Sequence, residues 1–116
     1  MTNQRIFGRR IEDVACSLLL RNGLSLIQRN YHCRFGEIDL IMKDVTTLVF
    51  VEVRFRKNNA FGSAAESIDH GKRRRIVFAA HHYLQRHNYS GDVRFDAVCC
   101  SANTEPEWIT GAFTND

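Results

Sequence analysis

Two short apolar segments, each interrupted by one acidic residue, constrain the fold of this chain more than any other feature. Residues 36–41 read Gly-Glu-Ile-Asp-Leu-Ile, and residues 48–54 read Leu-Val-Phe-Val-Glu-Val-Arg. Apolar runs of this length, separated by turn residues, are typical of β-strands. Asp39 and Glu52 therefore stand where hydrophobic side chains would be expected, and a carboxylate buried there is costly without partners.

The turn between these segments predicts which positions face each other. A four-residue turn over residues 44–47 pairs Asp44 with Thr47 and, counting outward, sets Asp39 directly opposite Glu52 in an antiparallel hairpin. Two like charges about 5 Å apart, at an effective dielectric of about 20, repel by about 3 kcal/mol. Burying one large aliphatic side chain contributes a similar amount. We therefore expect a positive group between the two carboxylates.

Periodicity in the rest of the chain predicts an α/β fold in which helices flank a mixed sheet. Gly23 is placed as the C-terminal cap of the first helix, and Asp69 as the N-terminal cap of the second. Helices are expected at residues 7–22 and 69–87, and strands at residues 24–33, 36–41, 48–54, 93–100 and 108–113. The fourth strand follows a helical crossover, so it should run parallel to the central third strand. The order is helix, three antiparallel strands, helix and parallel strand, in a single domain over residues 1–116.

Basic residues gather in places that suit contact with nucleic acid. The formal net charge of +3 conceals a run of four at residues 72–75 and a loop at residues 56–68 that opens with Arg56 and Lys57. That loop lacks periodicity and is predicted to be mobile beside the end of the central strand. A solvated surface that keeps the protein soluble is the alternative explanation for such charges. The residues predicted to contact phosphates are Arg9, Arg10, Arg56, Lys57, Arg73 and Arg74.

The remaining polar and sulfur-containing residues favour packing roles. The four cysteines show no Cys-x-x-Cys spacing, which favours reduced, packed thiols over zinc or disulfides; they are Cys16, Cys33, Cys99 and Cys100. Asp96 interrupts an apolar strand and is expected to be a hydrogen-bonded structural residue or to pair with a helix arginine. No apolar run approaches the about 20 residues that span a bilayer, and no signal-peptide pattern opens the chain. We expect a cytoplasmic protein.

The acidic residues predict a divalent-metal site. Asp39 and Glu52 supply hard oxygen ligands of the kind that Mg2+ or Mn2+ accepts. Glu12 lies on the flank of the first helix's apolar stripe and could approach the same sheet edge, although an acid in the first helical turn is also favoured by the helix dipole. Arg54 shares the face of Glu52 and could hold a phosphate or stabilise the charge of a transition state.

These residues together resemble the YraN family of predicted endonucleases. The resemblance lies in the helix-borne Glu12, in Gly-Glu-Ile-Asp at residues 36–39, in Phe-Val-Glu-Val-Arg at residues 50–54 and in Lys72. That family is similar to archaeal Holliday junction resolvases and belongs to the restriction-endonuclease-like, PD-(D/E)xK nucleases. The resemblance implies a restriction-endonuclease-like mixed sheet, metal binding by Asp39 and Glu52, and a catalytic role for Glu12. It also implies action on DNA, with branched or structured DNA as one candidate, and two-strand chemistry would favour a homodimer.

One position departs from the family pattern, because Arg54 stands where a lysine is usual. An arginine replaces the electrostatic part of a lysine's role but is a poor base. Lys72 could supply the missing amine, or it could be a solvated residue at a frayed helix start. Three hypotheses follow: a metal-dependent endonuclease, a nucleic-acid-binding protein without turnover, and a partner-binding domain in which Asp39 and Glu52 only form ion pairs with Arg54 and Lys72.

Overall fold

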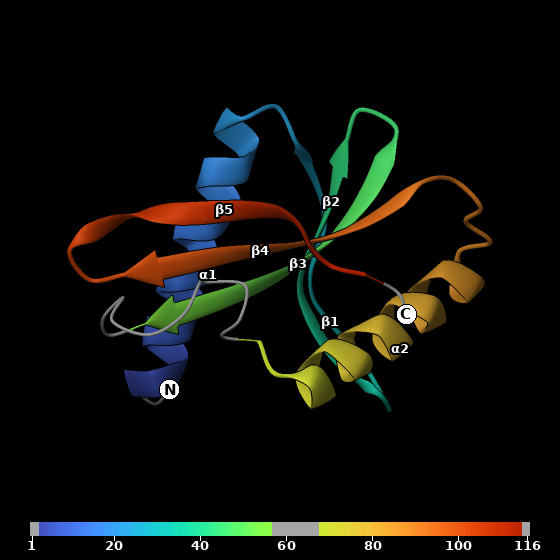
Figure 1. The fold of residues 1–116 in the computed structure, drawn as a ribbon, viewed down its shortest axis with the longest axis horizontal. Coiled ribbons are helices and arrows are strands. Elements are labelled where there is room, and N and C mark those ends of the chain that lie inside the picture. The colour runs from blue at the N-terminus through green and yellow to red at the C-terminus, as the bar shows by residue number, and fades with distance from the viewer. Residues whose placement is uncertain (1–2, 57–67, 115–116) are drawn as a thin grey trace.

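Over the part of the chain that the structure describes, two helices flank a five-stranded sheet in the computed structural model (Figure 1). The structure describes residues 3–56 and 68–114. Most of the loop predicted at residues 56–68, including Lys57, therefore lies outside the described residues. In chain order the elements are α1 (Asn3–Arg21), β1 (Ser25–Cys33), β2 (Gly36–Asp44), β3 (Thr47–Arg56), α2 (His70–Arg86), β4 (Val93–Ser101) and β5 (Thr104–Phe113).

The strands lie in the sheet in the order β1-β2-β3-β4-β5, with β3 in the middle. Neighbouring strands are antiparallel except for β3 and β4, which are parallel. The parallel pair follows from the connection, since α2 carries the chain from the end of β3 back to the start of β4. This mixed α/β architecture confirms the predicted fold class and is compatible with a restriction-endonuclease-like fold.

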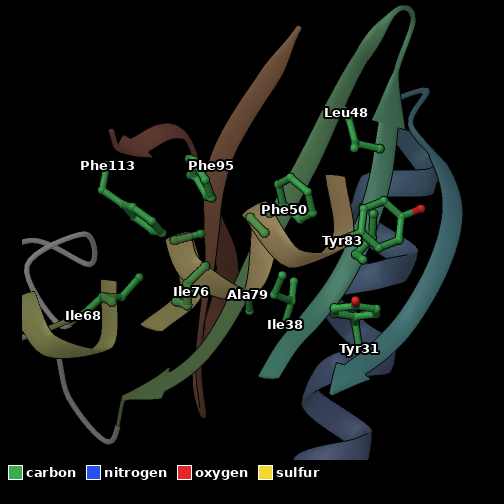
Figure 2. Close-up of a cluster of buried hydrophobic side chains, with 13 residues drawn as sticks. Tyr31, Ile38, Leu48, Phe50, Ile68, Ile76, Ala79, Tyr83, Phe95 and Phe113 are labelled. Atoms are coloured by element: carbon green, nitrogen blue, oxygen red, sulfur yellow. The ribbon is translucent and has the colours of Figure 1, made fainter. Parts of the chain in front are cut away.

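The sheet separates two apolar layers, because successive side chains of a strand point to opposite faces. Phe50 packs on one face with Ile76 and Ala79 of α2 (Figure 2). Val49 and Val51 pack on the other face with residues of α1 such as Leu19. Glu52 comes two residues after Phe50 and therefore belongs to the α2 face.

Both predicted helix caps are present. Gly23 adopts a φ of 93°, the left-handed conformation that favours glycine, and the N–H of Leu24 donates to the carbonyl of Leu19 at 3.1 Å. The carboxylate of Asp69 accepts a 2.8 Å hydrogen bond from the backbone N–H of Lys72. This cap fixes where α2 starts and so positions the Lys72 side chain relative to the sheet.

Asp96 has the structural role that the sequence predicts, but its partner is not a helix arginine. The carboxylate is fully buried and accepts hydrogen bonds from Arg94 Nε at 2.8 Å and Arg94 Nη2 at 2.9 Å. The indole N–H of Trp108 and the backbone N–H of Gly111 donate to it at 3.0 and 2.9 Å. Alternation along β4 explains the partner, since residues two apart lie on the same face. The network joins β4 to β5.

Within the described ranges, neither helix combines the length and the apolar character that crossing a lipid bilayer requires.

Candidate functional site

The site lies where β2 and β3 stop pairing. Paired positions run from Asp44 with Thr47 to Leu40 with Val51, which confirms the predicted register over these residues. Asp39 and Glu52 come one position beyond the last pair. There the Oδ2 atom of Asp39 accepts a 2.8 Å hydrogen bond from the backbone N–H of Val53. The hairpin thus presents its two acids at the open end of the β2–β3 ladder.

Glu52 is the most perturbed acid in the described part of the chain for which a shift is resolved. Glu52 is only 4% exposed to solvent. Burial, followed by a hydrogen bond and repulsion from the Asp39 carboxyl, raises the pKa of Glu52 to about 9. The charges of Lys72 and Arg54 oppose this rise. The repulsion between Asp39 and Glu52 that the register predicts is therefore present. In the metal-free protein, the raised pKa favours a proton on Glu52, which removes this repulsion.

Lys72 and Arg54 bring positive charge to the same carboxyl. Lys72 Nζ lies 3.7 Å from Glu52 Oε2, and the lysine side chain is 36% exposed. Arg54 lies two residues beyond Glu52 on the α2 face, and its charge favours the ionised form of Glu52. An amine and a guanidinium next to two acids can orient a phosphate and stabilise added negative charge.

Glu12 reaches this region from α1. Its carboxylate accepts hydrogen bonds from Asn30 Nδ2, 3.1 and 3.3 Å away, and lies 3.5 Å from Arg29 Nη2. Burial raises the pKa of Glu12, the hydrogen bond from Asn30 lowers it, and the charge of Asp39 raises it further. Glu12 is therefore close enough to act electrostatically on Asp39.

Asn30 is a site residue that sequence reasoning missed. It lies in β1 between the paired positions Arg29 with Leu40 and Tyr31 with Ile38, which places it across from Asp39. Its φ of 52° is unusual in a strand, and asparagine tolerates this left-handed region better than most residues. Its amide nitrogen donates to Glu12 and, at 3.1 Å, to Glu37. An asparagine inside a predicted strand was the available signal.

A divalent ion fits the donor set as a two-carboxylate site. Among the described residues, no group of three or more His, Cys, Asp or Glu side chains is placed so that it could hold a metal ion together. Mg2+ does not require one, because it usually keeps several waters and binds one or two carboxylates together with substrate phosphates. Asp39 and Glu52 match that requirement, and a cation would relieve the repulsion between them.

The predicted phosphate-binding residues are distributed over both helices and the end of β3. Arg9 and Arg10 are exposed on α1, and Arg74 is exposed on α2. Arg73 and Arg56 are half-buried, on α2 and at the last position of β3. These residues lie on the elements that also carry Glu12, Lys72 and Glu52.

The metal-free protein is expected to lose stability as the pH rises from about 5 to about 9. The pKa of Glu52 is near 4.5 in the unfolded chain and about 9 in the folded protein, so the folded state binds more protons over this window. The free energy of unfolding therefore falls with rising pH. Denaturant unfolding in EDTA at a series of pH values measures this slope. Glu52→Gln, which is neutral throughout, should flatten it, and an unchanged slope in that variant would contradict the assignment.

The chain is similar to proteins of several bacteria along nearly its whole length. Residues 11–100 match the model of an uncharacterised protein family, UPF0102. A UPF0102 protein of Nitrosomonas eutropha is 48% identical over 113 residues, covering 97% of each chain. UPF0102 proteins of Nitrosospira multiformis and Psychromonas ingrahamii are 51% and 52% identical, over 94% and 91% of this chain and 93% and 88% of theirs.

Proposed function

Because the chain belongs to UPF0102, a family whose description names no reaction, we propose a function from the site itself: a divalent-metal-dependent endonuclease that cleaves nucleic-acid phosphodiesters. The observation that carries the proposal is that a second carboxyl group, that of Asp39, lies next to the buried carboxyl group of Glu52. A structural ion pair with Lys72 needs only one acid. Burial, and then the neighbouring Asp39 carboxyl, raise the pKa of Glu52. Two adjacent acids of this kind are unfavourable without a cation and are therefore typical of functional sites.

Each residue has a role that its position supports. Asp39 and Glu52 would hold Mg2+ or Mn2+, which when bound polarises a phosphate oxygen and acidifies water. The Lys72 amine, 3.7 Å from Glu52, orients the attacking water or the phosphate. Arg54 stays protonated, so it stabilises negative charge in the transition state and does not act as a base. Glu12 adds negative charge from the α1 side.

The substrate we propose is DNA, including branched or structured DNA. The resemblance to nucleases related to Holliday junction resolvases supports this substrate. Four helix arginines supply phosphate contacts that do not depend on sequence, namely Arg9, Arg10, Arg73 and Arg74. Cleavage of two strands would need two sites, so a symmetric homodimer is part of the proposal. A cytoplasmic location is also part of it, because the free thiols of Cys16, Cys33, Cys99 and Cys100 fit a reducing compartment.

A nucleic-acid-binding protein without turnover is the second candidate, and Arg54 is the observation that favours it. If the reaction requires an amine at that position, the metal site would remain while cleavage would be weak. Lys72 is the group that distinguishes the two candidates, because its amine lies beside Glu52 from a different element.

A cleavage assay tests the proposal. Wild-type protein is incubated with linear, flapped and four-way DNA in Mg2+, in Mn2+ and in EDTA. We expect cleavage of at least one substrate with either metal and none in EDTA. DNA binding that weakens with salt but is not followed by cleavage would favour the binding protein. The absence of both DNA binding and cleavage would favour the third hypothesis, a partner-binding domain.

A further inference from the structure

A cavity of about 490 Å³ lies between α2 and the end of β5. Its volume falls within the range of about 300–1,000 Å³ that is common for small-molecule sites. It is distinct from the pair of acids, although Arg73, one of its lining residues, directly follows Lys72 in the chain. Its lining includes Arg73, Arg74, Phe78 and Phe113.

The lining combines positive charge with aromatic rings. Among the described residues that line the cavity, none is acidic, whereas Arg73 and Arg74 are both cationic. The Cζ atom of Arg73 lies 5.8 Å from the centre of the Phe113 ring, and that of Arg74 lies 5.9 Å from the centre of the Phe78 ring. Each guanidinium therefore stands beside an aromatic surface, a combination that suits an anionic ligand with a planar group.

Part of this lining is held in place before any ligand arrives. Phe113 stacks on Phe95 with ring centres 5.1 Å apart, and Figure 2 shows the two side by side. Arg73 Nε donates a 2.9 Å hydrogen bond to the carbonyl of Ile68. Phe78 remains 46% exposed. Groups that are already fixed lose less entropy on binding, so the cavity is prepared for a ligand while one aromatic wall stays accessible.

We propose that this cavity binds one unpaired nucleotide of a nucleic-acid strand. The base lies against Phe78, the exposed aromatic wall, and the phosphate lies at Arg73 and Arg74. The inference rests on the proposed function, which identifies the ligand as nucleic acid. To that function it adds a substrate class, strands with an unpaired nucleotide. Because Arg73 adjoins Lys72, which contacts Glu52, substrates with an unpaired base close to the cleaved bond are preferred over uninterrupted duplex.

Binding without metal tests this inference independently of turnover. Fluorescence anisotropy in EDTA measures the affinity for a labelled oligothymidylate of about 12 nucleotides and for a duplex of equal length. Wild-type protein should prefer the single strand. Phe78→Ala should weaken single-strand binding by about tenfold through lost stacking, and Arg74→Gln should also lower the ratio of single-strand to duplex affinity. Deoxyribose and ribose versions of the strand show which sugar the cavity accepts, and tighter binding of either supports the proposal.

Two matched variants separate the cavity from general surface effects. Arg75→Gln removes the same charge from an exposed neighbour that does not line the cavity. Phe7→Ala removes a phenylalanine of α1 that is also 46% exposed. Both should leave the affinity ratio unchanged. An unchanged ratio in Phe78→Ala, or an equal fall in the two controls, would overturn the inference. The ratio of single-strand to duplex affinity could fall in Phe78→Ala and Arg74→Gln while the wild-type protein cleaves no DNA with metal. That result would support nucleotide binding in the cavity and contradict the endonuclease proposal.

Discussion

Replacing either Asp39 or Glu52 with alanine is expected to lower the rate of metal-dependent cleavage by more than about a hundredfold. Removing a group that only orients a metal ligand already costs about 10- to 100-fold, and here a ligand itself is lost. The fold should survive loss of the Glu52 carboxyl, because its raised pKa of about 9 disfavours the charged form that would pair with Lys72, and the Lys72 side chain is 36% exposed. Cleavage rates at saturating Mn2+, with thermal unfolding as a check, measure both effects.

Glu105→Ala is the control for this experiment, since it removes an exposed acid of β5. It should cleave at the wild-type rate. Activity retained in Glu52→Ala, or an equal loss in Glu105→Ala, would show that the two carboxylates are not the metal ligands of a catalytic site.

Asp96→Ala is expected to destabilise the protein by about 3–5 kcal/mol, the usual effect of breaking a buried charged pair. The substitution leaves the N–H donors of Trp108 and Gly111 without their buried acceptor and removes two hydrogen bonds from Arg94. Such a loss is a large part of the about 5–15 kcal/mol by which proteins of this kind are stable. The free energy of unfolding in denaturant measures it.

Asp13→Ala provides the matched comparison. Asp13 also pairs with an arginine, at 2.7 Å, but its side chain is 57% exposed, whereas that of Asp96 is 0% exposed. Exposed pairs contribute about 0–1 kcal/mol, so Asp13→Ala should change stability little. If the two variants lost equal stability, burial would not be the source of the effect at Asp96.

The hairpin register could be predicted from the sequence because it depends on local information. A one-residue shift would move every apolar side chain of β2 to the opposite face, and the turn at residues 44–47 specifies the pairing. The start of α2 was equally local, since Asp69 is a capping residue placed before an apolar helical stripe. Both features together determine where Lys72 and Glu52 lie.

Features that depend on contacts between distant segments could not be predicted. The amide of Asn30 reaches Glu12 only because α1 packs beside β1, and an asparagine in a strand permits a left-handed backbone without requiring one. The cavity likewise requires the end of β5 to lie next to α2, which brings Phe113 to Arg73. Periodicity assigns elements and faces, whereas these neighbours follow from tertiary packing.

Binding of Mn2+ to the metal-free protein tests the central claim, that Asp39 and Glu52 form a divalent-metal site. Calorimetric titration at several pH values between about 6 and about 8 gives the affinity, and the same titration of Glu52→Gln serves as control. We expect saturable binding that tightens as the pH rises, because the metal and a proton compete for Glu52, and we expect Glu52→Gln to abolish it. Binding that is independent of pH, or equally strong in Glu52→Gln, would contradict the claim.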